Sequence, residues 1–394
     1  MMKKLLVSLL SALLCISVVA EPEIQSDGNQ NVNSITIDKN GDVFASPLWY
    51  HISSDSTAEV KQNDSYKDLK SIVIPSKIQI DGRIYPVTSI GEKGFSWCSK
   101  LRDIELPSSV TNIGENAFGK CSALININVA SDNYVFSSEN GMLYDKNKTK
   151  LICVPAGKNG KFVIPSSVTS IGDYAFYRCK GLTSIKIPSG VTSIGNDAFR
   201  GCSGLTSIKI PSGVTSIGDY AVSECYSLTS IEIPSSVTSI GSYAFSGCCC
   251  LTSIKIPSSV TSIGYYAFSE CYSLTNIEIP SGVTSIRSGA FSDCIKMKSM
   301  KIPSSVRSIE NKAFSGCSGL TSIEIPSSVT SIGDYAFKDC SGLTEIYIPS
   351  SVTHIEDWAF EDCKNLDVII DNSEENVKVG SDAFMGCKSV KFLK

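Results

Sequence analysis

Residues 182–204 read LTSIKIPSGVTSIGNDAFRGCSG, and close copies of this stretch follow one another head to tail along most of the chain. Each copy contains a proline, which recurs at every 23rd position without interruption, at Pro165, Pro188, Pro211, Pro234, Pro257, Pro280, Pro303, Pro326 and Pro349. A fixed period of this length is typical of repeat proteins, in which each unit packs only against its neighbours. The 394 residues therefore predict one elongated solenoid rather than several ordinary domains.

The apolar residues recur at the same places in each unit and predict one continuous core. Leu182, Ile185 and Ile187 have the spacing of a half-buried strand. The unit continues with five further apolar positions, namely Val191, Ile194, Ala198, Phe199 and Cys202. Stacked coils would place one position in a spine of rings, made by Phe176, Phe199, Phe245, Phe268, Phe291, Phe314, Phe337 and Phe360. Val222 interrupts this spine, and we expect a local packing defect of about 1 kcal/mol there.

The N-terminal stretch, residues 1–20, has the organisation of a secretory signal peptide. Lys3 and Lys4 precede an apolar run, and a small-residue exit ends at Ala20, after which we place the cleavage. The run is short for a bilayer span, and we expect no transmembrane segment after signal removal. Cleavage removes two of the 35 basic residues and changes the formal net charge from −4 to −6. Such an acidic secreted chain offers no electrostatic case for binding nucleic acid.

The mature chain divides into three further segments. Residues 21–33 are polar and predict a flexible leader. Strand-like pieces over residues 34–68 predict an N-terminal β cap, because the open end of a solenoid would expose its core. Repeats fill residues 69–394, and the Ala-Phe positions from Phe95 to Phe384 count 12 coils.

One irregular segment interrupts the repeats. The step from Pro107 to Pro165 is longer than the sum of two regular periods, and we interpret it as one period plus a long insertion. Within the insertion, Asn140 and Gly141 separate two strand-like runs, a strong hairpin signal. The sequence predicts a β-hairpin insertion at about residues 130–163 that projects from the solenoid.

Cysteine usage is regular as well. Of the 16 cysteines, 12 share one position of the repeat: Cys98, Cys121, Cys179, Cys202, Cys225, Cys248, Cys271, Cys294, Cys317, Cys340, Cys363 and Cys387. Equivalent cysteines on neighbouring coils would lie about 4.8 Å apart, farther than the ~3.8 Å between the Cβ atoms of a disulfide. We therefore predict a column of buried free thiols. The cluster Cys248, Cys249 and Cys250 leaves room for an irregular bond.

The sequence gives no grounds for a catalytic, cofactor or metal site. The two histidines, His51 and His354, lie far apart in the sequence and, in an elongated solenoid, also in space, so no catalytic triad can be assembled. A column with one cysteine per coil does not converge on a metal ion. Glutamates such as Glu232 and Glu278 would lie about 9 Å apart on an open sheet, with nothing to raise the pKa of either. We expect a protein that is not an enzyme and holds no cofactor.

The predicted strands present one candidate binding face. The residue between the two Ile positions reads, from coil to coil, Lys186, Lys209, Glu232, Lys255, Glu278, Lys301, Glu324 and Tyr347. Mostly alternating charges relieve repulsion between stacked strands. This structural role is our preferred explanation of the pattern. The same flat, repetitive surface is also suited to a large partner.

Units such as residues 320–337, followed by Cys340, resemble the leucine-rich repeat of BspA-like bacterial surface proteins, which has the same period. The resemblance covers nearly all of residues 69–387. It implies the α/β leucine-rich-repeat class, here strongly β-rich, as a right-handed solenoid of about 12 stacked coils with an N-terminal β cap. It also implies secretion or surface exposure and, for some members, adhesion to host matrix proteins or other cells.

Two hypotheses on function follow. The first is a secreted or cell-surface protein-binding and adhesion protein, monomeric and non-catalytic, whose partners are host matrix or cell-surface proteins or other bacterial cells. The alternative is an extracellular glycan-active enzyme or a glycan-binding protein on the same scaffold. A clustered acid and base in a cleft would favour an enzyme, and the sequence shows no such pair.

Overall fold

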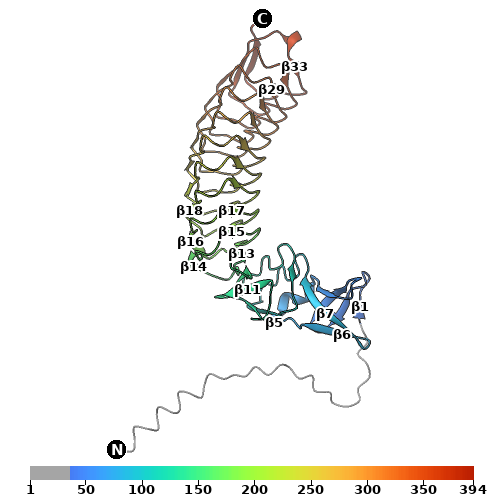
Figure 1. Cartoon of the computed structure of the whole chain (residues 1–394). Coiled ribbons are helices and arrows are strands. Elements are labelled where there is room, and N and C mark those ends of the chain that lie inside the picture. The colour runs from blue at the N-terminus through green and yellow to red at the C-terminus, as the bar shows by residue number, and fades with distance from the viewer. Residues whose placement is uncertain (1–35) are drawn as a thin grey trace, which may run out of the picture. The chain divides into compact units, whose positions relative to one another are not determined.

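The chain is described from a computed structural model, which covers residues 36–394. The predicted signal peptide and leader lie outside the described residues. From Ile37 onward the chain forms one unit of short strands, and the two helices described are the 3-10 turns η1 (Asp64–Asp68) and η2 (Glu374–Asn376). Figure 1 shows the strands stacked in successive coils, which confirms the predicted β-rich solenoid.

The Leu-x-x-Ile-x-Ile stretches form a first column of parallel strands. These are β5 (Ser71–Val73), β8 (Asp103–Leu106), β10 (Asn126–Val129), β14 (Gly160–Val163), β16 (Leu182–Lys186), β18 (Ser207–Lys209), β20 (Ser230–Glu232), β22 (Ser253–Ile254), β24 (Asn276–Ile277), β26 (Ser299–Lys301), β28 (Ser322–Glu324), β30 (Glu345–Ile348), β32 (Asp367–Ile370) and β34 (Ser389–Phe392). Paired strands are in register from coil to coil, so that Ile208 of β18 lies opposite Ile231 of β20. Equivalent side chains therefore form straight columns.

The Val-Thr-Ser-Ile stretches form a second column. It consists of β7 (Arg83–Ile90), β9 (Asn112–Ile113), β13 (Lys150–Cys153), β15 (Ser170–Ile171), β17 (Ser193–Ile194), β19 (Ser216–Ile217), β21 (Ser239–Ile240), β23 (Ser262–Ile263), β25 (Ser285–Ile286), β27 (Ser308–Ile309), β29 (Ser331–Ile332), β31 (His354–Ile355) and β33 (Lys378–Val379). Their isoleucines are mostly buried and face the core.

Fixed turns carry the chain from one column to the next. The Val260 N–H donates to the Pro257 carbonyl at 3.0 Å, which closes the turn after the first column. After the second column the chain enters what we call the corner, for example residues 264–271. Each corner contains two residues in the left-handed region, here Tyr266 at φ 53° and Glu270 at φ 57°. Because these turns recur at fixed places, every coil has the same outline.

Stacked phenylalanine rings fill the centre of the solenoid, as predicted. Phe268 is fully buried, and its ring centroid lies 5.3 Å from that of Phe245 and 5.6 Å from that of Phe291, with nearly parallel planes. Burial of one such side chain contributes about 1.5–3 kcal/mol. Val222 occupies this position in one regular coil and is also buried, so the stack of rings is interrupted there.

The cysteine column lies beside the ring stack. All 15 described cysteines are unpaired, and 11 of the 12 in the column are buried. The Cys271 thiol donates to the Phe245 carbonyl of the preceding coil at 3.3 Å, and ten other thiols of the column make the equivalent bond. The thiols therefore link neighbouring coils, besides filling space as small apolar groups. Burial raises the pKa of the Cys225 thiol to about 12, so this thiol stays protonated at neutral pH.

The segment predicted as an insertion is a complete coil, which we call the irregular coil (residues 124–158). Leu124 begins it, one regular period after Leu101, and Lys158 ends it, because Asn159, one regular period before Leu182, begins the next coil. The irregular coil is therefore about half as long again as a regular one. Leu151 and Val154 take the Ile and Phe places of the coil, since they bond to Gly172 and Ala175 as regular residues do. Counting this coil gives about 13 turns, one more than the Ala-Phe positions indicate.

The predicted projection of the hairpin is wrong. Strands β11 (Phe136–Glu139) and β12 (Met142–Asp145) form an antiparallel hairpin, but β12 also pairs with β13. Leu143 and Tyr144 are fully buried. Their side chains belong to two separate apolar clusters, one on each side of the hairpin. The hairpin is built into the solenoid because exposing these side chains would forfeit their burial.

An antiparallel meander precedes the first coil. Strands β2 (Val43–Ala45), β3 (Leu48–Ile52) and β4 (Ala58–Val60) pair in order, and β4 continues in parallel onto β7. The short strand β1 (Thr36–Ile37) begins the described chain, and β6 (Lys77–Ile80) forms a hairpin with β7. Tyr66 of η1 accepts the N–H of Trp49 in β3 and is buried, with its ring 5.6 Å from that of Phe95. The meander thus adds a layer that covers the apolar end of the first coil.

Candidate functional site

The first candidate surface is the exposed face of the first-column strands, which we call the charged column. It consists of the eight residues that the sequence singled out: Lys186, Lys209, Glu232, Lys255, Glu278, Lys301, Glu324 and Tyr347. All eight side chains are exposed, and Tyr347 is 48% exposed. The strand register places Lys301 directly opposite Glu324. The structure therefore brings all eight onto one face, at intervals of one coil.

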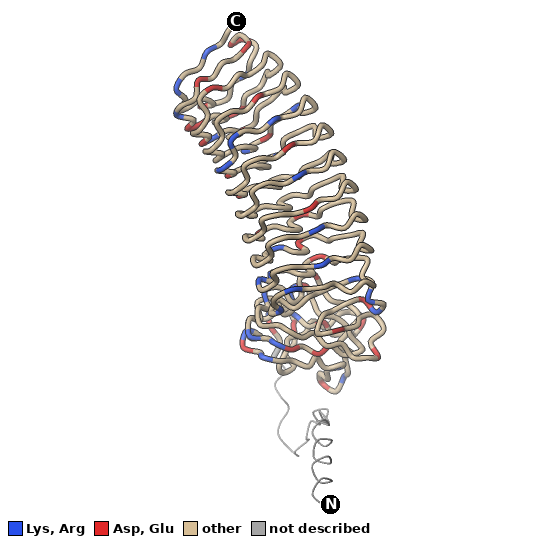
Figure 2. The backbone as a smooth tube through the Cα atoms, turned by 90° about the vertical axis from the view of Figure 1, so that its left-hand side faces the viewer, with Lys and Arg blue, Asp and Glu red and all other residues tan. Residues whose placement is uncertain are grey.

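Opposite charges alternate along much of the charged column. The Lys209 Nζ lies 2.6 Å from the Glu232 Oε2, and both side chains are largely exposed. An ion pair this accessible contributes little to stability, because solvent and salt screen it. Figure 2 shows basic and acidic residues scattered along the coils with no large region of one sign. A partner would therefore meet many small polar contacts rather than one strong field.

A second surface, which the sequence reasoning missed, is a column of aromatic rings on the corners. This aromatic column contains Tyr220, Tyr243, Tyr266, Tyr335 and Trp358. The Tyr243 ring stacks on Tyr220 at 4.6 Å and on Tyr266 at 5.0 Å, and Tyr335 stacks on Trp358 at 5.1 Å. All five residues have φ between 53° and 56°, a strained conformation for an aromatic residue that costs on the order of 1 kcal/mol. The recurring Tyr-Ala-Phe triplet was the available sequence signal.

The aromatic column is interrupted at Gly289 and Lys312. A Cβ atom on Gly289 would lie 2.1 Å from Cε1 of Tyr266, so the Tyr266 ring lies against the glycine, where a regular corner has a side chain. A shallow hollow of about 650 Å³ follows, and the serines Ser246, Ser269, Ser292 and Ser315 contribute to its lining. Partial burial, with a smaller contribution from Asp339, raises the pKa of Asp293, which also lines the hollow. We call this the aromatic hollow.

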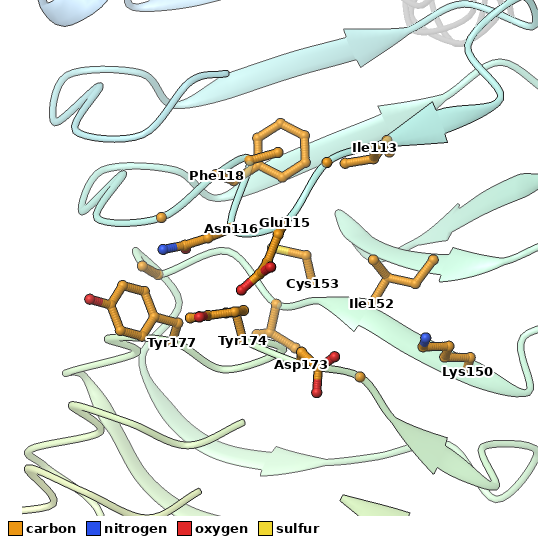
Figure 3. A pocket seen from close by; sticks show the side chains of 16 residues that line it. Ile113, Glu115, Asn116, Phe118, Lys150, Ile152, Cys153, Asp173, Tyr174 and Tyr177 are labelled. Atoms are coloured by element: carbon orange, nitrogen blue, oxygen red, sulfur yellow. The ribbon is translucent and has the colours of Figure 1, made fainter. Parts of the chain in front are cut away.

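The third feature is a cavity of about 270 Å³ beside the irregular coil, which we call the corner cavity (Figure 3). Its walls are the corner before the irregular coil, the irregular coil itself and the corner after it. Figure 3 shows Glu115 directed across the cavity toward Tyr174, with Lys150 at the opposite end. Burial and hydrogen bonding with Glu115 raise the pKa of Tyr174. The phenol of Tyr174 is therefore neutral at physiological pH.

The two histidines lie in different parts of the fold and do not contact each other. His51 Nδ1 lies 3.0 Å from the Asp42 carboxylate in the N-terminal meander, whereas His354 lies in β31 and contacts Thr353 at 2.9 Å. Within residues 36–394, no group of three His, Cys, Asp or Glu side chains is placed to hold a metal ion. No helix in the same residues has the length and apolar character needed to span a bilayer.

Comparison with known proteins relates the chain to bacterial surface repeats. A family model for the BspA type leucine rich repeat region matches in six copies, over residues 64–159, 155–275 and 261–391. The structure of a leucine-rich cell surface protein from Faecalibacterium prausnitzii is 29% identical, with 90% of this chain and 95% of that chain covered and a TM-score of 0.51. A leucine-rich repeat protein from Bacteroides ovatus is 27% identical, with coverage of 89% and 99% and a TM-score of 0.58. No match was found among curated proteins.

Proposed function

Since the chain belongs to the BspA-type leucine-rich repeat family, we propose that it is a secreted or cell-surface protein that binds macromolecules through the charged column, without catalysis. The partners are host matrix or cell-surface proteins, or proteins on other bacterial cells. The similar protein from Faecalibacterium prausnitzii is described as a cell surface protein, which supports this location. The binding unit is the monomer.

The observation that supports this function is the exposure of all eight residues of the charged column on a single in-register face. From Lys186 to Tyr347 the column crosses seven coil intervals, roughly 34 Å at strand spacing. A standard protein interface takes about 800 Å² from each partner, which a face of this length can supply. Because each coil repeats nearly the same surface, weak contacts to a repetitive partner add through avidity.

Charge reversal tests the proposal. Lys255→Glu and Lys301→Glu together break the alternation of the charged column, while Lys296→Glu and Lys364→Glu make the same change in net charge at exposed sites off the column. Binding to immobilised matrix proteins and to bacterial cells should fall several-fold for the first pair and stay unchanged for the control pair. Equal binding by wild type and both double variants would rule out the charged column as the binding face.

The aromatic hollow favours saccharide binding as a second candidate function. Sugar rings present apolar faces that pack on aromatic rings and hydroxyl groups that pair with polar side chains. The hollow is lined by the Tyr266 ring beside Glu270, Asp293 and Lys312. A glycan array should show binding that Tyr266→Ala abolishes and Tyr220→Ala, outside the hollow, preserves. Cleavage of any arrayed glycan would instead support the glycan-active enzyme.

A further inference from the structure

In the regular coils, each corner donates backbone hydrogen bonds to the next coil from alternate residues. In one corner these run from Tyr174 to Asn196 (3.0 Å), from Phe176 to Ala198 (2.7 Å) and from Arg178 to Arg200 (2.7 Å). The corner at Tyr266, Phe268 and Glu270 repeats all three bonds. Donation from every second residue is the pattern of a strand in a sheet.

The pattern stops at the corner before the irregular coil, residues 114–121. The N–H groups of Asn116, Phe118 and Lys120 find no acceptor within residues 36–394. The reason lies in the irregular coil, where only Ile152 and Cys153 separate Leu151 from Val154. Regular coils have twice as many residues at this place, so two residues of the layer that would supply the acceptors are missing, although Val154 still occupies the Phe place.

The opposite wall of the corner cavity has backbone carbonyls without a donor. In regular coils, the carbonyls at the places of Asp173 and Tyr177 each accept an N–H from the preceding coil. The Asp173 and Tyr177 carbonyls accept no backbone N–H from the described chain. The Glu115 carboxylate likewise accepts no backbone N–H from residues 36–394, whereas the equivalent Asp173 carboxylate accepts the Asn196 N–H at 2.7 Å. The cavity thus has free donors on one wall and free acceptors on the other.

The dimensions match one missing strand. The corners on either side of the irregular coil are two layers apart, which is roughly 9–10 Å at normal strand spacing. Val154 already fills the middle of this gap, where its N–H donates to the Ala175 carbonyl, so an added extended chain would occupy the part of the gap beside it, between Asn116 and Asp173. The cavity of about 270 Å³ has room for only a few residues of such a chain.

We propose that the corner cavity binds an extended segment of a partner polypeptide that carries a basic side chain. The backbone of the segment supplies the missing layer, with its carbonyls accepting from Asn116 and Phe118 and an N–H donating to the Asp173 carbonyl. Strand addition of this kind gives affinity through the main chain and selectivity through side-chain pockets. The site is separate from the charged column and does not depend on the function proposed for it.

The side chains around the cavity select the basic residue. Glu115 directs its carboxylate across the cavity and Lys150 lies at the far end, whereas the Asp173 carboxylate accepts the Asn196 N–H of the next coil. Phe118, 7% exposed, and Ile152 offer apolar surface to the aliphatic stem of a lysine or arginine. A saccharide would not use a row of N–H groups from alternate residues, which favours a peptide over a sugar at this site.

A random heptapeptide library displayed on phage and selected on the intact protein tests the proposal. The selected peptides should be enriched in lysine and arginine and poor in proline, which cannot donate an N–H. Synthetic copies should bind the wild type about tenfold or more tightly than they bind a Glu115→Lys variant, because that change places a cation in the site of the basic side chain. Failure to select any peptide above background would overturn the proposal.

A restored corner gives a second test. Replacing Ile152 and Cys153 with Gly-Asp-Tyr-Ala, the sequence that follows Ile171, supplies the missing layer from the protein itself. This variant should lose peptide binding, whereas Lys255→Glu with Lys301→Glu should retain it. Undiminished binding by the restored variant would contradict the proposal. If the restored variant does not fold, the Glu115→Lys variant, whose substitution is at an exposed site, takes its place. Undiminished peptide binding by Glu115→Lys would then contradict the proposal. Loss of binding in the charged-column variant alone would place the peptide on that face instead.

Discussion

The regular coils and the irregular coil bury side chains at equivalent places but differ at their corners, and the apolar core divides into two clusters at the irregular coil. In both, an apolar residue at the Phe place accepts the thiol of the next coil, since Cys179 donates to Val154 as Cys202 donates to Phe176. The irregular coil has a shorter corner, and there the backbone ladder is open. The regular coils therefore form a uniform surface, the charged column, that is suited to multivalent contact. The irregular coil forms a single site of distinct shape, the corner cavity.

The largest expected effect is the loss of stability when the Phe place of a regular coil, rather than that of the irregular coil, is changed to alanine. Phe268→Ala removes a ring stacked on both sides and should lower the free energy of unfolding by about 3–5 kcal/mol. Val154→Ala, at the equivalent place of the irregular coil, should cost about 2 kcal/mol. Urea unfolding followed by circular dichroism measures both. Equal losses would mean that the ring stack contributes no more than simple burial.

A glycine substitution tests whether Gly289 makes room for the Tyr266 ring at the aromatic hollow, where the regular pattern of the corners is interrupted. Gly289→Ala would place a Cβ against the Tyr266 ring and should cost roughly 1–2 kcal/mol and displace that ring. The matched control is Gly160→Ala, because Gly160 also has a positive φ, 85°, and a Cβ there would meet nothing within 4 Å. Thermal melts of the two variants should differ by several degrees. Identical melting temperatures would show that the ring does not rest on Gly289.

The bond between thiol and carbonyl predicts a smaller effect in the regular coils. Cys271→Ala removes the donor to the Phe245 carbonyl and should cost about 1 kcal/mol, whereas Cys271→Ser keeps a donor and should cost less. Urea unfolding of the pair decides between them. If alanine proves the better replacement, the cysteines serve as apolar filling alone.

Much of the fold and the first candidate surface could be predicted from the sequence. The period, the ring stack around Phe268 and the exposure of the charged column follow from apolar residues recurring at one constant interval, where local pattern and global fold agree. The corner cavity could not be predicted, because proline spacing reports only the net change in length. A long hairpin insertion hides the shortening between Leu151 and Val154. The aromatic column was visible as a recurring Tyr-Ala-Phe, but nothing in the letters shows that neighbouring tyrosines stack or that Gly289 opens a hollow.

The smallest expected effect concerns pH at the aromatic hollow. Partial burial raises the pKa of Asp293 above its ordinary value of 3.8, so folding favours the protonated form. The contribution of Asp293 to stability is therefore greatest at low pH and falls as the pH rises from the unfolded pKa through the folded one. Asp293→Asn removes this loss, so it should raise the melting temperature slightly at pH 7 and leave it unchanged near pH 3. A variant that melts lower at pH 7 would mean that the ionised carboxylate is stabilised in the fold.

Hydrogen exchange tests the difference between the two kinds of corner most directly. Deuterium uptake followed by mass spectrometry, on the intact protein without a partner, compares residues 114–121 with residues 172–179. The amides of Asn116, Phe118 and Lys120 should exchange at least about tenfold faster than those of Tyr174, Phe176 and Arg178, which are bonded to the next coil. Equal protection of the two corners would contradict the account, because it would mean that the ladder runs unbroken past the irregular coil.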